Sequence, residues 1–277
     1  MAKKTKHVFD IIEVKATDKQ IADYANRYLD VRSEIVADIS KLDTEPRFKN
    51  LGFSTEQLKD VIRKNTKPGR VAKTGRKKGV HRDIYRSDLG ELLLTIYFEE
   101  CVGDENCFVI PIKNIWDREL NDLPGRGFDT LGYKVGDKGI KLLLGESKVS
   151  SENKNPPQVV DQSEDSIYKS QLKNHKDKNY LTKRLSNYIK KVSSDHVEHL
   201  GTVLLCIDEG LINEYEIVYG CCLVREKEYL DKKKDFGKLK TNSKDFEPHK
   251  VHFALISFDK KVEDVVNLFH KKVEELT

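Results

Sequence analysis

The spacing of apolar positions along the chain alternates between two periods, one typical of strands and one typical of helices. Strand patterns cover residues 7–16, 107–112, 127–149 (as a hairpin), 202–207, 216–224 and 251–258. Apolar positions three and four apart predict helices over residues 17–29, 35–42, 54–62, 87–97, 159–172, 180–192 and 262–273. Strands mixed with helices of this length predict an α/β fold, in which a central sheet is covered by helices.

The hairpin at residues 127–149 carries the most informative polar side chains. Its turn is the Gly-Asp-Lys-Gly sequence at residues 136–139, and the run 142–144 is apolar enough to be buried. Residues two apart on a strand share a face, so Glu146 and Lys148 are expected to point the same way. Folding at the turn brings Asp129 of the first strand toward Glu146. Two carboxylates and one ammonium group are therefore expected to converge.

Two explanations account for this group of charges. A plain salt bridge between Glu146 and Lys148 at a solvent-facing strand edge explains the Glu-Ser-Lys tripeptide by itself. Hydrolysis of a phosphodiester needs the same residue types, because Mg²⁺ binds through one or two carboxylates and lowers the pKa of an attacking water. In that case Asp129 and Glu146 hold the metal, and Lys148 orients the water or stabilises charge on the phosphoryl group.

The segment ahead of the hairpin offers a third acid. Ser87 is expected to cap a helix, which places Glu91 in its first turn. An acid there stabilises the helix dipole by roughly 0.3 to 1 kcal/mol, which is a sufficient structural explanation. The position just ahead of the hairpin makes a third catalytic carboxylate the alternative.

Composition and charge narrow the class of protein. The 277 residues are 38% hydrophobic and 35% charged, enough for one large domain or two small ones. We divide them into an α-rich substructure at residues 1–82 and a core at residues 83–277. The sequence has no apolar run of about 18 residues and no secretory signal, which favours the cytoplasm. Five cysteines without a C-x-x-C pair are expected to be reduced.

The net charge of +4 says little as a total, so its distribution matters more. Residues 63–82 carry lysines and arginines with no acid and three glycines, which predicts a basic, mobile loop. That loop is either a solvated charge run or a contact for phosphates. The helix at residues 180–192 is decorated by Lys183, Arg184, Lys190 and Lys191, which fits a nucleic-acid backbone or an ordinary surface.

Other catalytic or metal-binding motifs are weak or missing. His196 and His199 lie three apart, but no cysteine or acid at ligand spacing completes a metal site. The sequence has no G-x-x-x-x-G-K-[ST] loop for nucleotide phosphates and no G-x-S-x-G elbow for a nucleophilic serine. The hairpin charges are the set that remains.

The order of these features resembles the PD-(D/E)XK nuclease superfamily over about residues 85–207. The proline that precedes the first acid of that motif is replaced here by Gly127-Phe128. The resemblance implies a restriction-endonuclease-like core. It also implies that Asp129, Glu146 and the Ser147 carbonyl bind Mg²⁺ or Mn²⁺, that Lys148 assists the nucleophile, and that Glu91 is an auxiliary acid.

The whole layout is also similar to the HamA family, the nuclease subunits of bacterial Hachiman anti-phage systems. The residues that carry this likeness are Arg126-Gly127-Phe128-Asp129 and Gly145-Glu146-Ser147-Lys148. It implies a DNA-degrading effector with little sequence preference, controlled by the helicase subunit HamB. The alternative is a non-catalytic nucleic-acid-binding or adaptor subunit that keeps the fold. The first 60 residues or so and residues 232–244 are candidate partner surfaces, and the oligomeric state is left open.

Overall fold

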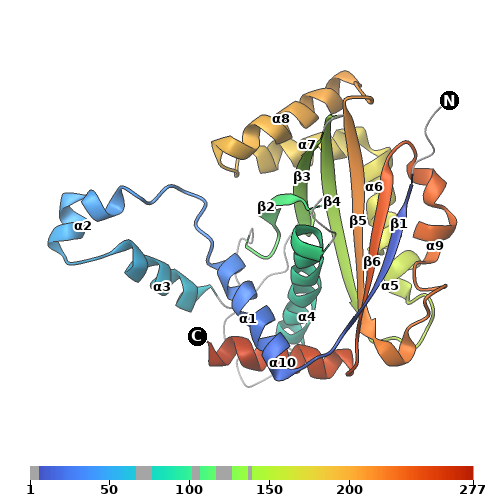
Figure 1. Cartoon of the computed structure of the whole chain (residues 1–277), viewed down its shortest axis with the longest axis horizontal. Helices are drawn as coiled ribbons and strands as arrows, with labels where there is room; N and C mark the ends of the chain where they lie inside the picture. Colours follow the sequence, from blue (N-terminus) through green and yellow to red (C-terminus); the bar gives the residue numbers. More distant parts are fainter. Residues whose placement is uncertain (1–5, 67–76, 102–106, 117–126, 137–138, 277) are drawn as a thin grey trace.

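One mixed β-sheet organises the computed structural model of the chain (Figure 1). The structure describes residues 6–66, 77–101, 107–116, 127–136 and 139–276. Within them the sheet has six strands in the order β1-β6-β5-β4-β3-β2. Strands β1, β6, β5 and β4 run parallel, and β3 and β2 join antiparallel at the β4 edge. The predicted α/β class is confirmed; the restriction-endonuclease-like assignment stays a prediction.

The strands are β1 (Val8–Val14), β2 (Val109–Lys113), β3 (Thr130–Gly136), β4 (Gly139–Ser150), β5 (Tyr215–Glu226) and β6 (Lys250–Phe258). The α-helices are α1 (Asp18–Arg32), α2 (Pro46–Asn50), α3 (Thr55–Asn65), α4 (Lys77–Ile96), α5 (Gln158–Asp161), α6 (Ile167–Lys176), α7 (Lys178–Ile189), α8 (Ser194–Glu209), α9 (Gly237–Thr241) and α10 (Val262–Glu275). Short helical turns are η1 (Leu42–Thr44), the π-helical η2 (Tyr97–Cys101), η3 (Lys227–Tyr229) and η4 (Ser243–Phe246).

Helices cover both faces of the sheet and divide the core in two. Helices α1, α4 and α10 pack on one face, where their apolar side chains meet Leu143, Val218 and Ala254 of the strands. Helices α5 to α9 cover the other face and contact Leu142 and Leu144 of β4. Successive strand side chains thus alternate between the two helical layers, as their period of two requires.

The predicted hairpin is confirmed. Gly136 pairs with Gly139 at the turn, and the antiparallel pairing runs back to Thr130 opposite Gly145. Gly139 adopts φ of +110°, which L side chains rarely adopt, so the turn depends on glycine there. This register places Asp129, the residue before Thr130, beside Glu146, the residue after Gly145.

Residues 202–207, which we expected to form a strand, lie inside α8. The buried side chains of α8 are Leu200, Val203, Cys206 and Ile207, at helical spacing, while Leu205 is 65% exposed. A buried strand would have covered all of them. The helix ends at Gly210 with φ of +73°, a common signal for a helix C-terminus.

Two helix boundaries also differ from expectation. Residues 35–41 form no helix, because the Asp38 side chain accepts the N–H of Ser40 at 2.9 Å and competes with helical hydrogen bonding. Helix α4 begins at Lys77, so Ser87 lies inside the helix and does not cap it. The upstream turns are held to the core by Ile84 and Tyr85, which are both buried.

The structure differs in part from the prediction in three further segments. The ends of the predicted basic loop 63–82 are helical, in α3 and α4, and residues 67–76 lie outside the described part of the chain. The helix expected at residues 159–172 is broken into α5 and α6. The charged segment 232–244 contains α9 and is anchored by the buried Phe236 and Leu239. The sequence also predicts a turn at residues 121–125, which lie outside the described residues.

The segment 33–66 extends away from the sheet as an arm that carries α2 and α3 (Figure 1). None of its residues is buried. By contrast β1 pairs in parallel with β6, and α1 packs on α10. The division at residue 82 stays a prediction. Among the described residues, no helix has the length and apolar character needed to cross a membrane.

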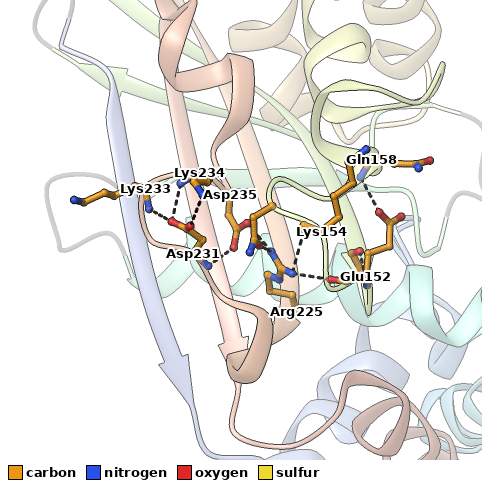
Figure 2. Close-up of polar contacts among 10 residues, drawn as sticks. Glu152, Lys154, Gln158, Arg225, Asp231, Lys233, Lys234 and Asp235 are labelled. Carbon is orange, nitrogen blue, oxygen red and sulfur yellow. Dashed lines mark hydrogen bonds and ion pairs between the residues drawn. The ribbon is translucent and has the colours of Figure 1, made fainter.

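A buried ion pair lies near the carboxyl ends of β4 and β5. Arg225 and Asp235 are both 0% exposed, with Nη1 and Oδ1 2.6 Å apart. Figure 2 shows Arg225 between Asp235 and the segment after β4. Its guanidinium donates to the Glu152 carbonyl and to Asn155 Oδ1, each at 2.7 Å. The chain that leaves β4 is thereby fixed to the end of β5.

Candidate active site

The candidate site lies where β3 and β4 diverge. Their ladder ends at Thr130 and Gly145, and beyond that point β4 continues to Ser150 paired with β5. Asp129 comes directly before β3 and donates its N–H to the Gly145 carbonyl at 3.2 Å. Its carboxylate oxygen Oδ2 then accepts the N–H and the hydroxyl of Ser147, at 2.6 and 2.9 Å. The side chain of Asp129 thus occupies the edge of β4 that β3 has left.

Glu146 and Lys148 point to the same side of β4, as predicted. They continue the face of Leu142 and Leu144, toward helices α6 and α7. Lys148 Nζ lies 3.2 Å from Glu146 Oε1 and 3.4 Å from Asp165 Oδ2. The convergence of Asp129, Glu146 and Lys148 is therefore confirmed, whereas their catalytic roles stay predictions.

The two carboxyls of the site hold their protons more tightly than free acids do. Burial is the main cause, and the negative charge of Asp129 adds to it, so that the pKa of Glu146 is raised to about 8. Burial also raises the pKa of Asp129, although the hydrogen bonds from Ser147 oppose that shift. Burial alone would lower the pKa of Lys148, but the surrounding carboxylates outweigh it and raise that pKa.

A cavity of about 340 Å³ opens in front of Glu146 and Lys148. Its far wall is built by α6 and α7 and carries Lys169, Lys173 and Arg184. Asp165 and Glu164 lie at its rim. The cavity therefore has an acidic floor and a basic wall, an arrangement that accommodates a cation beside a phosphate.

Arg184 is a site residue whose role the sequence did not indicate. Its guanidinium stacks over Phe128 at 4.0 Å and donates to the Tyr180 hydroxyl at 2.9 Å. Its charge also opposes the upward pKa shifts of Asp129 and Glu146, which burial outweighs. Gly127 permits this close fit, since a Cβ there would overlap the hydroxyl of Tyr188. A cation on a predicted helix could not be assigned to this cavity without knowing the helix packing.

Glu91 lies deep under the site rather than in it. It is 3% exposed, accepts a hydrogen bond from Ser87 at 3.1 Å and one from Asn114 at 3.3 Å. The adjacent Gly90 packs against Ser147 and Val149, on the face of β4 opposite Glu146. Glu91 is therefore in the middle of α4, and the expected first-turn position is wrong. Its role as an auxiliary acid stays a prediction.

The donors at the site determine whether a divalent cation fits there. No group of three or more His, Cys, Asp and Glu side chains suitable for a metal occurs in the part of the chain that the structure describes. Asp129 and Glu146 form a buried pair of carboxyls in which the charge of Asp129 raises the pKa of Glu146, and a cation would favour the charged form of both. A protein usually contributes one or two carboxylates to a Mg²⁺ site, and water and substrate oxygens supply the remaining ligands. Ligation by the Ser147 carbonyl stays a prediction.

The histidines of α8 have a structural explanation. His196 Nδ1 lies 3.0 Å from the Tyr133 hydroxyl, and the ring of His199 lies 4.8 Å from the ring of Tyr133. Both imidazoles thus help to pack α8 on β3.

These observations define a mixed α/β protein with a buried pair of carboxylates and a lysine at the point where two strands diverge. The family model HamA matches residues 2–273, and the chain belongs to the HamA family. No curated protein and no solved structure matches it. Membership of this family points to a role in Hachiman defence, within a system that has a partner.

Proposed function

We propose that the chain is a metal-dependent deoxyribonuclease that hydrolyses phosphodiester bonds with little sequence preference. The observation that carries this proposal is the pair of buried carboxyls beside Lys148, in which the pKa of Glu146 is raised to about 8. A structural salt bridge would need one carboxylate. A second carboxyl, which burial and the charge of Asp129 keep protonated at the floor of the cavity, is costly to the fold, and the charged form of both carboxyls becomes favourable when a cation binds.

Asp129 and Glu146 would hold Mg²⁺ or Mn²⁺, which would supply a polarised phosphoryl oxygen and an acidified water. Asp129 is held in position by its two hydrogen bonds from Ser147. Lys148 is held beside Glu146 at 3.2 Å and orients the attacking water or neutralises charge on the phosphate. Glu91 supports the site through Asn114, whose N–H donates to the Asp129 carbonyl at 3.0 Å.

The proposed cellular role is that of an effector in anti-phage defence whose DNA cleavage is controlled by the helicase subunit HamB. The family match supports the defence role and a partner. DNA as the substrate is supported by the basic wall of the cavity, because phosphate contacts by Lys and Arg attract nucleic acid independently of sequence.

Cleavage of plasmid DNA by the purified chain, alone and with its helicase partner, tests the activity. We expect cleavage to require Mg²⁺ or Mn²⁺ and to fall at least a hundredfold, on the order of one lost electrostatic contact, in Glu146→Gln and in Lys148→Ala. The exposed Lys271→Ser, far from the cavity, is the matched control. Full-rate cutting by both site variants would remove the assignment.

The competing function is a nucleic-acid-binding or adaptor subunit without turnover. One observation favours it: Lys148 also pairs with Asp165, so its charge is shared among carboxylates as in a structural ion-pair network. DNA binding that weakens with salt, in a sample that never cleaves with either metal or with the partner, would identify this function.

A further inference from the structure

Helix α6 carries a row of lysines on one face, and two of them lie in its last turn, where cations interact favourably with the helix dipole. Lys169, Lys173 and Lys176 lie four and three residues apart, and hence on one face of the helix. Lys169 pairs with Glu164 at 2.7 Å, but Lys173 and Lys176 form no ion pair in the part of the chain that the structure describes. Like charges at this spacing repel each other and destabilise a helix. An anion that lies along the row would compensate that repulsion.

The row leads directly into the candidate active site. A second hollow, open to solvent, is lined by Lys169, Leu172, Lys173, Lys176, Asp177, Lys178 and Asn179. Lys169 and Lys173 line both this hollow and the cavity that contains Glu146. The two hollows are therefore neighbours that meet at these lysines, and a chain of phosphates in the outer one would lie beside the cavity that contains Glu146.

Tyr180 follows Asn179, which lines the outer hollow, and carries an aromatic ring. It lines the inner cavity and is half-buried. Lys173 Nζ lies 4.2 Å from its ring centre, and Arg184 Cζ lies 5.1 Å from it. Stacking of a nucleobase is worth more than an exposed cation–aromatic contact, so a base can displace the Lys173 ammonium from the ring and leave it free for a phosphate.

We propose that this groove is the entry path for single-stranded DNA, with Lys173 and Lys176 on the phosphates and Tyr180 stacked on a base. The proposal rests on the proposed nuclease function and names its substrate as a single strand. A basic groove with an aromatic platform is how proteins bind single strands without reading sequence. In a duplex the base faces are covered by neighbouring bases, so Tyr180 would have nothing to stack on.

Salt dependence of binding tests the phosphate contacts. The experiment uses the full chain carrying Glu146→Gln, in EDTA, with a fluorescent oligonucleotide of mixed sequence, so that no cleavage occurs. Each lost phosphate contact reduces the slope of log K against log salt by about 0.7 for a single strand. We expect Lys173→Ser with Lys176→Ser to reduce the slope by about 1.4 in total. The pair Lys260→Ser and Lys271→Ser, exposed around α10, should leave it unchanged.

Tyr180 variants test the choice of single strand over duplex. Tyr180→Ala should weaken binding of the single strand by about fivefold to a hundredfold, the range for one lost stack. Tyr180→Phe loses the hydroxyl that Arg184 contacts but keeps the ring, and should bind as the parent does. Binding of a duplex of the same length should change little in either variant. Thermal unfolding of each variant shows whether the fold is intact.

The outcomes separate this proposal from the nuclease function. If the lysine and Tyr180 variants bind the single strand with unchanged affinity and unchanged salt dependence, the proposed entry path is wrong. This holds even if the unsubstituted chain cleaves DNA and the Glu146→Gln variant does not. If the variants lose binding as expected but the parent never cleaves with metal, the path stands and the nuclease function falls. Loss of binding to a purified acidic partner subunit, with DNA binding unchanged, would assign the lysine row to a protein and overturn the proposal.

Discussion

Glu146 is the residue whose chemistry depends most on its surroundings. Burial and the charge of Asp129 raise its pKa to about 8, so near neutral pH without a metal it is largely protonated. A divalent cation binds the deprotonated form and must displace that proton. Below the raised pKa, affinity for the metal should therefore rise with pH by about tenfold per unit, the value for one proton released.

Calorimetric titration of Mn²⁺ into the metal-free chain between pH 6 and 9 measures this dependence. We expect affinity to rise through this range and to level off above about pH 8. In Asp129→Asn the affinity falls, and the levelling moves to lower pH because a charge that raises the pKa of Glu146 is gone. An affinity that is flat with pH would contradict a role for Glu146 as a ligand.

The same shift affects the folded state. A carboxyl whose pKa is raised by folding stabilises the fold at low pH, and this stabilisation is lost as pH rises through the raised pKa. For Glu146 the loss falls between about pH 4.5, its ordinary value, and about pH 8. Glu146→Gln cannot ionise, so its unfolding temperature should exceed that of the metal-free parent more at pH 8.5 than at pH 5.

At this scale the sequence predicted the pairing of charges but not their environment. Alternation along β4 was sufficient to place Glu146 and Lys148 together, and the glycine turn was sufficient to bring Asp129 near. The hydrogen bonds from Ser147 to Asp129 depend on where β3 leaves the sheet, which no local pattern records. Arg184 depends on how α7 packs, a tertiary property.

At the scale of elements, Gly→Ala substitutions at two positions distinguish the effect of packing on stability from the effect of helix propensity. Gly127 lies where the chain enters β3, and a Cβ there would overlap the hydroxyl of Tyr188, which accepts the N–H of Phe128 at 3.1 Å. Gly201 is in the middle of α8, with nothing within 4 Å of the added Cβ. We expect Gly127→Ala to cost about 1 to 3 kcal/mol through overpacking.

Gly201→Ala is the matched control for this prediction. It should raise stability by about 0.5 to 1 kcal/mol, because alanine loses less conformational entropy in a helix. Denaturant unfolding of both variants gives the two values. A Gly127→Ala variant as stable as the parent would mean that α7 does not pack on the start of β3 as described.

The element that the sequence misassigned, α8, illustrates the limit of local patterns. The run 203–207 is apolar throughout, so a buried strand and a helix fit it equally well over that length. Residues 194–209 taken together have buried positions at 200, 203 and 207, and the exposed Leu205 is compatible only with the helix. For α4 the error was of the same kind, because its polar first turns hid where the helix begins.

At the scale of the whole molecule, Arg225 joins three segments that are distant in sequence. It projects from the end of β5, pairs with Asp235, and donates hydrogen bonds to the loop that follows β4 (Figure 2). Both partners of the pair are fully buried, and burial raises the pKa of Asp235 even though Arg225 opposes that shift. The favourable electrostatic energy of the pair is therefore mostly offset by the cost of desolvating the two charges, which is usual for buried pairs.

Removing one partner from such a pair is costly, because it leaves the other charge buried without compensation. We expect Asp235→Ala to destabilise the chain by about 3 to 5 kcal/mol. Asp235→Asn should cost less, since its amide oxygen can still accept the Asp231 N–H, which Asp235 Oδ2 accepts at 2.8 Å. Glu275→Ala, at an exposed pair on α10, should leave the unfolding midpoint unchanged. Denaturant unfolding of the three variants measures these differences.

The loop held by Arg225 begins right after β4, so the same substitutions should also reach the candidate site. Residues 152–155 are then held less firmly, so the end of the strand that carries Glu146 and Lys148 gains freedom to move. No side chain of the site itself is substituted. Metal affinity measured well below the unfolding midpoint should then weaken in Asp235→Asn but not in Glu275→Ala. Equal metal affinity in both would mean that β5 alone, through its parallel pairing with Glu146 and Lys148, is sufficient to hold the carboxylates.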